Sequence, residues 1–172
     1  MVRGYDDMSE PAGAVAVHGH DDTSEPARAG SRIDVGRWTA LAAAVLRDEG
    51  VDSGELGLHF VDRDAMADLN GTHMGASGPT DVLAFGIDGA GNGSSPGPVR
   101  LLGDVVVCPG YAAAQAPRHA GEGHDGSLDD ELGLLVVHGV LHIVGYDHAD
   151  GDEAAAMQAR ERELLAAHHR RP

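Results

Sequence analysis

Apolar residues recur along this chain with two spacings, one typical of helices and one typical of strands. Between residues 34 and 49 they return every three or four positions, which predicts an amphipathic helix. A last helix is predicted over about 152–167. Short runs that are alternating or wholly apolar predict four strands, at 14–18, 56–61, 81–87 and 101–108.

Polar residues mark where two further helices are expected to begin. Asp62 or Asp64 can cap a short helix that ends at about Leu69. Ser127, with Asp130 three residues later, has the pattern of a helix start and precedes a long apolar segment.

The remaining segments connect these elements. Residues 88–98 are rich in Gly, Ser and Pro and are expected to join two strands as a plain hairpin, with a gating lid as the alternative. A helix follows Pro109, and a polar loop covers 118–126. Early alternation of strands and helices, then a hairpin, then helices, predicts an α+β fold. We expect a small mixed sheet of about four strands packed against about five helices.

A polar heptad occurs twice, at residues 6–12 and 21–27. Two copies are too few for a repeat architecture, so the first is expected in a mobile tail and the second in a loop. The tail at 168–171 is expected to be solvated. The chain is thus expected to have a flexible N-terminal extension, 1–12, and a single domain, 13–172, which has room for a sizeable core.

Charge and cysteine content narrow the possible functions. The formal net charge of the 172-residue chain is −16, and every basic residue is an arginine. An acidic chain is a poor general binder of RNA, because affinity rests largely on neutralising phosphates. The single cysteine, Cys108, cannot form an intrachain disulfide and is expected to be buried. Without a signal-peptide core or a membrane-length apolar run, the protein is predicted to be cytoplasmic.

Three histidines carry the strongest chemical signal. His138 and His142 are four residues apart, so on a helix they lie on one face. Gly145 can adopt the left-handed conformation that ends a helix, which lets His148 return to the same point. Three imidazoles with an open position are typical of catalytic zinc. The sequence therefore predicts a metal site on a central buried helix, holding one Zn²⁺ per chain, although imidazole also suits other divalent transition metals.

The histidine spacing also matches the metzincin metalloproteases, in which a glutamate follows the first histidine. That glutamate is the general base of the protease reaction. Here the position is Gly139, which has no side chain to move a proton. A zinc metalloprotease-like hydrolase therefore stays an alternative.

The stretch HGVLHIVGYDH at 138–148 resembles the signature of the YbeY family. The segments LN at 69–70, GPTDVLAF at 78–85 and LGDVV at 102–106 are similar to further family segments in the same order, and the resemblance runs from about residue 14 to the C-terminus. It implies a metal-dependent endoribonuclease, directed at single strands, that processes the 3′ end of 16S ribosomal RNA and takes part in ribosome quality control. Its implied partners are ribosomal RNA and the ribosome or ribosomal proteins.

The same resemblance implies that His138, His142 and His148 are zinc ligands and act in catalysis through a bound water. Three neutral ligands leave the charge of the ion uncancelled, and such an ion can lower the pKa of water from 15.7 to about 7. Met74 stands where many family members have arginine, and Ala84 and Gly86 where serine and proline are common. Because methionine cannot bind phosphate, a non-catalytic ribosome-assembly factor with a structural metal is the second alternative.

Five other residues are weaker candidates for the site. Asp147 either orients an imidazole or caps the turn before the third ligand. Thr80 and Asp81 either line the substrate edge or simply begin a strand. Arg100 and Arg118 either contact phosphate or are solvated surface residues.

Overall fold

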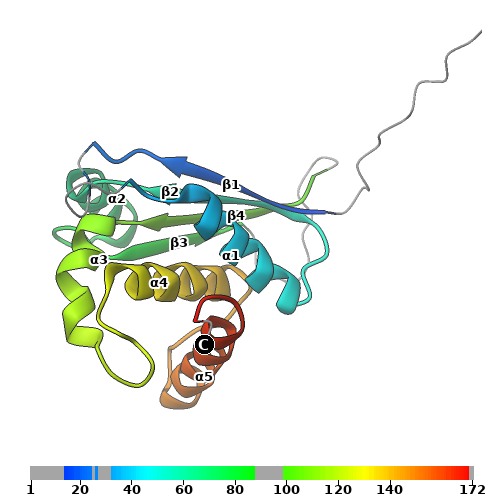
Figure 1. Cartoon of the computed structure of the whole chain (residues 1–172). Coiled ribbons are helices and arrows are strands. Elements are labelled where there is room, and N and C mark those ends of the chain that lie inside the picture. Colours follow the sequence, from blue (N-terminus) through cyan, green and yellow to red (C-terminus); the bar gives the residue numbers. More distant parts are fainter. Residues whose placement is uncertain (1–13, 25, 27–31, 88–98, 171–172) are drawn as a thin grey trace, which may run out of the picture.

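The computed structural model describes residues 14–24, 26, 32–87 and 99–170. Over these residues it shows a four-stranded sheet, five α-helices and one short 3-10 helix (Figure 1), which confirms the predicted α+β fold. None of the described helices is both long enough and apolar enough to cross a membrane. The elements are β1 Val15–Asp21, α1 Val35–Asp48, β2 Gly54–Phe60, α2 Arg63–Met74, β3 Val82–Gly86, β4 Leu101–Val107, α3 Pro109–Gln115, η1 Ala116–His119, α4 Leu128–Ile143 and α5 Gly151–His168.

The sheet is mixed, as expected, with the strand order β1-β2-β4-β3. Strands β1, β2 and β4 are parallel, and β3 pairs antiparallel with β4 at one edge. Parallel neighbours need a crossover connection, and α1 supplies it between β1 and β2. The pairing of β3 with β4 agrees with the predicted hairpin, whose connection at 88–98 lies outside the described residues.

Helices α1 and α4 cover one face of the sheet, and α5 packs on α4 on the side away from the sheet (Figure 1). Leu56, Leu58 and Phe60 of β2 are fully buried in the core that these layers share. On the other face, Val106 of β4 packs in a smaller cluster with Met66 of α2. Because α4 lies between the sheet and α5, it is apolar nearly all round, as its sequence indicated.

The start of α4 confirms the helix start predicted at Ser127. The Ser127 hydroxyl accepts a hydrogen bond from the backbone N–H of Asp130 at 3.1 Å. A glycine in α4 allows this helix to lie close to the sheet. A Cβ atom on Gly139 would come within 2.5 Å of Val105 Cγ1, so only glycine fits at this spacing. The helix turn that carries His138 is therefore seated directly on β4.

The prediction for α2 was wrong in two respects. The helix continues past Leu69 to Met74, where Gly75, with a φ of 64°, ends it in the left-handed conformation. Its N-cap residue, Asp62, makes no side-chain cap. Instead, the Asp62 carboxylate accepts hydrogen bonds from the backbone N–H of Ser24 at 2.9 Å and from its hydroxyl at 2.6 Å. A contact with a distant loop thus replaced the local cap.

The N-terminal part of the chain differs from the prediction in the length of its strand. Strand β1 runs three residues beyond its predicted end, because His20 and Asp21 continue the register with β2. The second heptad copy, expected in a loop, therefore begins inside a strand. The first copy and the proposed extension, 1–12, lie outside the described residues, so the division of the chain stays a prediction.

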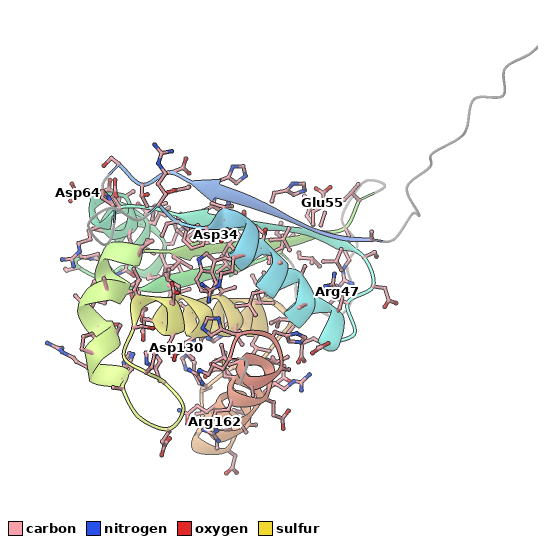
Figure 2. All side chains as sticks on the ribbon, viewed as in Figure 1. Asp34, Arg47, Glu55, Asp64, Asp130 and Arg162 are labelled. Atoms are coloured by element: carbon pink, nitrogen blue, oxygen red, sulfur yellow. The ribbon has the colours of Figure 1, made fainter. Side chains whose placement is uncertain are left out.

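The C-terminal histidines, expected to be solvated, are held by carboxylates. His168 Nε2 lies 2.6 Å from Asp48 Oδ2, and His169 Nε2 lies 2.9 Å from Asp130 Oδ1. The His169 side chain is only 4% exposed and packs beside the Trp38 ring. Asp130 stands at the start of α4 (Figure 2), so these contacts fasten the end of the chain to two other helices. The sequence of the tail does not indicate which carboxylates the two histidines contact.

Candidate metal centre

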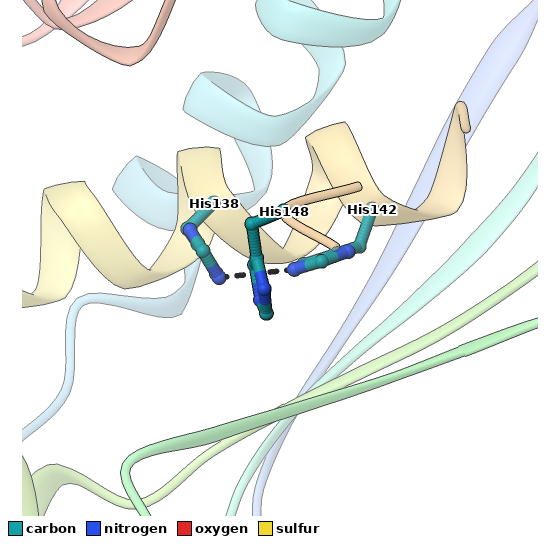
Figure 3. Close-up of side chains that lie close together, drawn as sticks. All are labelled: His138, His142 and His148. Atoms are coloured by element: carbon teal, nitrogen blue, oxygen red, sulfur yellow. Dashed lines mark hydrogen bonds between the residues drawn. The ribbon is translucent and has the colours of Figure 1, made fainter. Parts of the chain in front are cut away.

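Three imidazoles converge beside α4 (Figure 3). His138 and His142 lie one turn apart on this helix, with their Nε2 atoms 3.1 Å from each other. His148 comes from the loop after the helix, and its ring centroid lies 5.9 Å from that of His138 and 4.9 Å from that of His142. One nitrogen from each ring lies within 4.8 Å of the other two. The structure thus brings together the three residues that the sequence singled out.

The chain returns to the site through the glycine turn that the sequence suggested. Gly145 has a φ of 107°, and its N–H donates to the carbonyl of His142 at 3.1 Å. The N–H of Tyr146 donates to the carbonyl of Leu141 at 3.0 Å. This pair of bonds is the Schellman ending of a helix. The Asp147 carboxylate then accepts a hydrogen bond from the backbone N–H of His148 at 2.7 Å. This bond stabilises the turn that presents the third imidazole.

A carboxylate from α5 holds the first imidazole. Glu161 Oε1 lies 2.5 Å from His138 Nδ1, and Glu161 is only 7% exposed. The sequence pattern did not single out this residue. The feature that could have revealed Glu161 is its charge within the buried face of α5, whose other members are Met157, Leu164 and Leu165.

The electrostatic environment favours a neutral imidazole at His142. Burial lowers the pKa of His142, and the positive charges that His138 and His148 can carry lower it further, while Asp147 opposes them. A histidine must be neutral to bind a metal ion, so this environment suits a ligand. The donor set of three imidazole nitrogens fits one divalent transition ion such as zinc, copper, iron or nickel.

The position of the protease glutamate, Gly139, does not face the three histidines. A side chain there would meet Val105 Cγ1 at 2.5 Å and Val82 Cγ2 at 3.4 Å, within the interface between α4 and the sheet. A glutamate at this position would collide with β4 with α4 seated as it is. This packing strengthens the case against protease chemistry that the bare sequence made.

The other four candidate residues lie at the ends of strands or in a short helix. Thr80 donates to Asp81 Oδ1 at 3.3 Å, and the same oxygen accepts the backbone N–H of Val82 at 2.8 Å, where β3 begins. Arg100 directly precedes β4, and the exposed Arg118 lies in η1. A role for any of them in binding substrate stays a prediction.

A second group of ligand-type side chains lies at the start of α4. Atoms of His124, Asp125 and Asp130 lie within 4.8 Å of one another. The His124 ring is already fully used, because its Nδ1 accepts the N–H of Gly126 at 2.9 Å and its Nε2 lies 2.9 Å from the buried carboxylate of Glu131. A neutral imidazole bonded in this way has no lone pair left for a metal. We interpret this group as a structural network.

Comparison with known proteins shows which family the chain resembles. The family model described as "Endoribonuclease YbeY" matches residues 27–169, which include the three histidines and Glu161. The protein named Endoribonuclease YbeY from Salinispora tropica is 46% identical over 145 residues, covering 80% of this chain and 89% of its own. Its namesake from Thermobifida fusca is 50% identical over 117 residues, covering 65% and 70%.

A protein from Thermotoga maritima whose structure was solved in solution matches with a TM-score of 0.52 at 19% identity, covering 87% of this chain and 89% of that one. At this identity the likeness shows a shared fold. The family match, in contrast, extends over most of the chain, and the relatives that share it are about half identical to this sequence. The chain therefore belongs to the YbeY endoribonuclease family.

Proposed function

We propose that the protein is a metal-dependent endoribonuclease that cuts single-stranded RNA during ribosomal RNA maturation, including the 3′ end of 16S ribosomal RNA, and that it serves ribosome quality control in the cytoplasm. The observation that carries the proposal is the convergence of three imidazoles, one of them bonded to a buried carboxylate. The names of the relatives supply the substrate class, since they are endoribonucleases.

His138, His142 and His148 would hold the ion, which we propose to be zinc, one per chain. When bound, such an ion supplies Lewis-acid chemistry, which makes a water molecule more acidic and stabilises negative charge on a phosphate oxygen. The chain's own groups prepare the site. Burial lowers the pKa of His142, which favours the neutral form, and Glu161 accepts the hydrogen bond from His138 Nδ1.

Access to the site suits a polymer substrate. His148 is exposed, and the His138 and His142 side chains are partly exposed, so one side of the cluster faces solvent. With a net charge of −16, the chain as a whole repels RNA. We therefore propose that recognition depends on ribosomal RNA in its ribosomal setting, with the ribosome or its proteins as partners.

One observation favours a second candidate, a non-catalytic ribosome-assembly factor with a structural metal. Met74, where the family resemblance implies an arginine in many members, is 63% exposed at the end of α2 and offers no charge to a phosphate. A protease is disfavoured, because Gly139 is packed against the sheet.

Cleavage of a ribosomal RNA precursor, offered within ribosomal particles, tests the proposal. Wild type, His142→Ala and His20→Ala are purified identically, loaded with zinc and assayed for metal content. His20 is an exposed histidine on β1 and serves as the matched control. We expect wild type and His20→Ala to cut, and His142→Ala to lose both metal and cutting.

Three results would count against the proposal. Full metal occupancy in His142→Ala would refute the ligand assignment. Failure of zinc-loaded wild type to cut would favour the assembly factor. Cleavage of an unfolded protein that a chelator stops would restore the protease.

A further inference from the structure

We infer that Glu161 is a positioning residue that fixes the tautomer and orientation of His138, which makes α5 a working part of the metal centre. The inference rests on the metal binding put forward above as part of the proposed function. It concerns a residue on a helix that carries none of the three histidines.

The burial of Glu161 needs an explanation. Taking a carboxylate out of water is costly unless the carboxylate is paired and hydrogen bonded. Glu161 is 7% exposed, within a stripe whose other members are apolar, and its hydrogen-bond partner is His138 Nδ1 at 2.5 Å. An apolar side chain would fill this position without that cost.

Anchoring of α5 does not account for the carboxylate. Met157, Leu164 and Leu165 on the same helix are each 1% exposed in the core. Arg160 adds an ion pair, with its Nε 2.6 Å from Glu49 Oε1. Since these contacts already fasten α5, we attribute the buried charge at 161 to its effect on His138.

The hydrogen bond decides which ring nitrogen of His138 carries the proton. A neutral imidazole has one N–H and one lone pair, and the partner of one nitrogen sets the state of the other. Because a carboxylate accepts at Nδ1, the lone pair belongs to Nε2, which lies 3.1 Å from His142 Nε2. Without Glu161, either nitrogen could carry the proton, and the ring could turn.

The same contact closes the segment that carries the third imidazole. His148 lies between α4 and α5, and Asp150 starts α5 by accepting the N–H of Glu153 at 2.8 Å. The bond from Glu161 back to α4 bridges 23 residues and ties the two helices together across this segment. Glu161 therefore acts on one ligand directly and limits the movement of the loop that holds another.

Zinc affinity in the absence of RNA, together with the ring tautomer, tests the inference. The variants are Glu161→Gln, which keeps an acceptor but loses the charge, and Glu161→Ala, which loses both. Glu163→Gln is the matched control, because it removes the same charge from the same helix at a side chain that is 67% exposed. Full-length proteins are titrated with zinc against a chromophoric chelator at fixed pH, and the ring ¹⁵N shifts of His138 are recorded without metal.

We expect zinc affinity to fall by about 10- to 100-fold in Glu161→Ala, less in Glu161→Gln, and by under about twofold in Glu163→Gln. The ¹⁵N shifts should show the Nδ1–H form in wild type and a mixture of tautomers in Glu161→Ala. A merely structural residue would lower the melting temperature and leave the tautomer unchanged.

Wild-type affinity in folded Glu161→Gln and Glu161→Ala, with an unchanged tautomer, would overturn the inference. If Glu161→Ala does not fold, the affinity of Glu161→Gln relative to Glu163→Gln decides. Wild type that binds no zinc would refute the metal assignment of the proposed function, and the tautomer in metal-free protein would still test Glu161.

Discussion

Adding one methyl group at Gly139 tests how closely α4 is seated on the sheet. The new Cβ atom would lie 2.5 Å from Val105 Cγ1, whereas carbon atoms in favourable contact are about 3.5–4.0 Å apart. Val105 is fully buried, so it has little room to move. Overpacking of this kind costs about 1–3 kcal/mol. Replacing glycine in a helix interior gains about 1 kcal/mol, which offsets only part of that cost.

We therefore expect Gly139→Ala to lower the free energy of unfolding by about 1 kcal/mol, the midpoint of the two opposing effects. Gly71→Ala is the matched control, because a Cβ atom on this α2 glycine would meet only the carbonyl oxygen of Ala76, at 3.8 Å. That variant should gain up to about 1 kcal/mol. The two variants should thus differ by about 2 kcal/mol, or about 4–8 °C in melting temperature for a chain of this size.

The assay is urea unfolding of the metal-free proteins, with Val105→Ala and the double variant Val105→Ala/Gly139→Ala completing a cycle. Removing the Val105 methyl groups should relieve the clash, so the two substitutions should couple by about 1–2 kcal/mol. If Gly139→Ala is as stabilising as Gly71→Ala and shows no coupling to Val105, the close seating of α4 is wrong. The packing explanation for the missing glutamate would then be lost as well.

Three further predictions follow from the site and the core. Zinc at a hundred times its dissociation constant should stabilise the fold by at most about 2.7 kcal/mol. The melting temperature of wild type should therefore rise, EDTA should reverse the rise, and His142→Ala should show none. No rise in wild type would contradict the metal site. Cys108 is fully buried, and burial raises the pKa of its thiol. A thiol reagent at pH 8 should therefore label Cys108 only in unfolding concentrations of urea. Rapid labelling of the native protein would disprove its burial. Arg160→Ala removes the ion-pair partner of the nearly buried Glu49 and should lower the free energy of unfolding by about 1–3 kcal/mol. The same change at the exposed Arg162 should have little effect, and equal effects of the two changes would mean that the ion pair contributes nothing.

The parts of the site that sequence alone predicted are those set by short-range geometry. A spacing of four on a helix places His138 beside His142, and a left-handed glycine at 145 brings His148 back, whatever the rest of the chain does. The serine cap at 127 is likewise local. Each of these depends on residues within a turn or two, so the sequence pattern determines it.

The contacts that sequence reasoning missed join distant residues. Glu161 meets His138 across 23 residues, and His169 meets Asp130 across 39. Nothing in the spacing of either pair indicates the other partner, because only the packing of α5 on α4 brings them together. The absent cap at Asp62 has the same cause, since its carboxylate is taken by Ser24, 38 residues away.

The three histidines lie close together in the sequence, which affects how the protein would acquire the proposed ion. All three imidazoles lie within residues 138–148, and a loop this short closes at little entropic cost even in an unfolded chain. A nascent or denatured chain can therefore compete for zinc, and any such binding lowers the stabilisation that the native affinity would otherwise give. An ion shared by His138 and His142 would also favour the first turns of α4, whose nucleation is the unfavourable step in forming a helix. Metal capture can then precede folding, and Glu161 adds its contribution only when α5 docks.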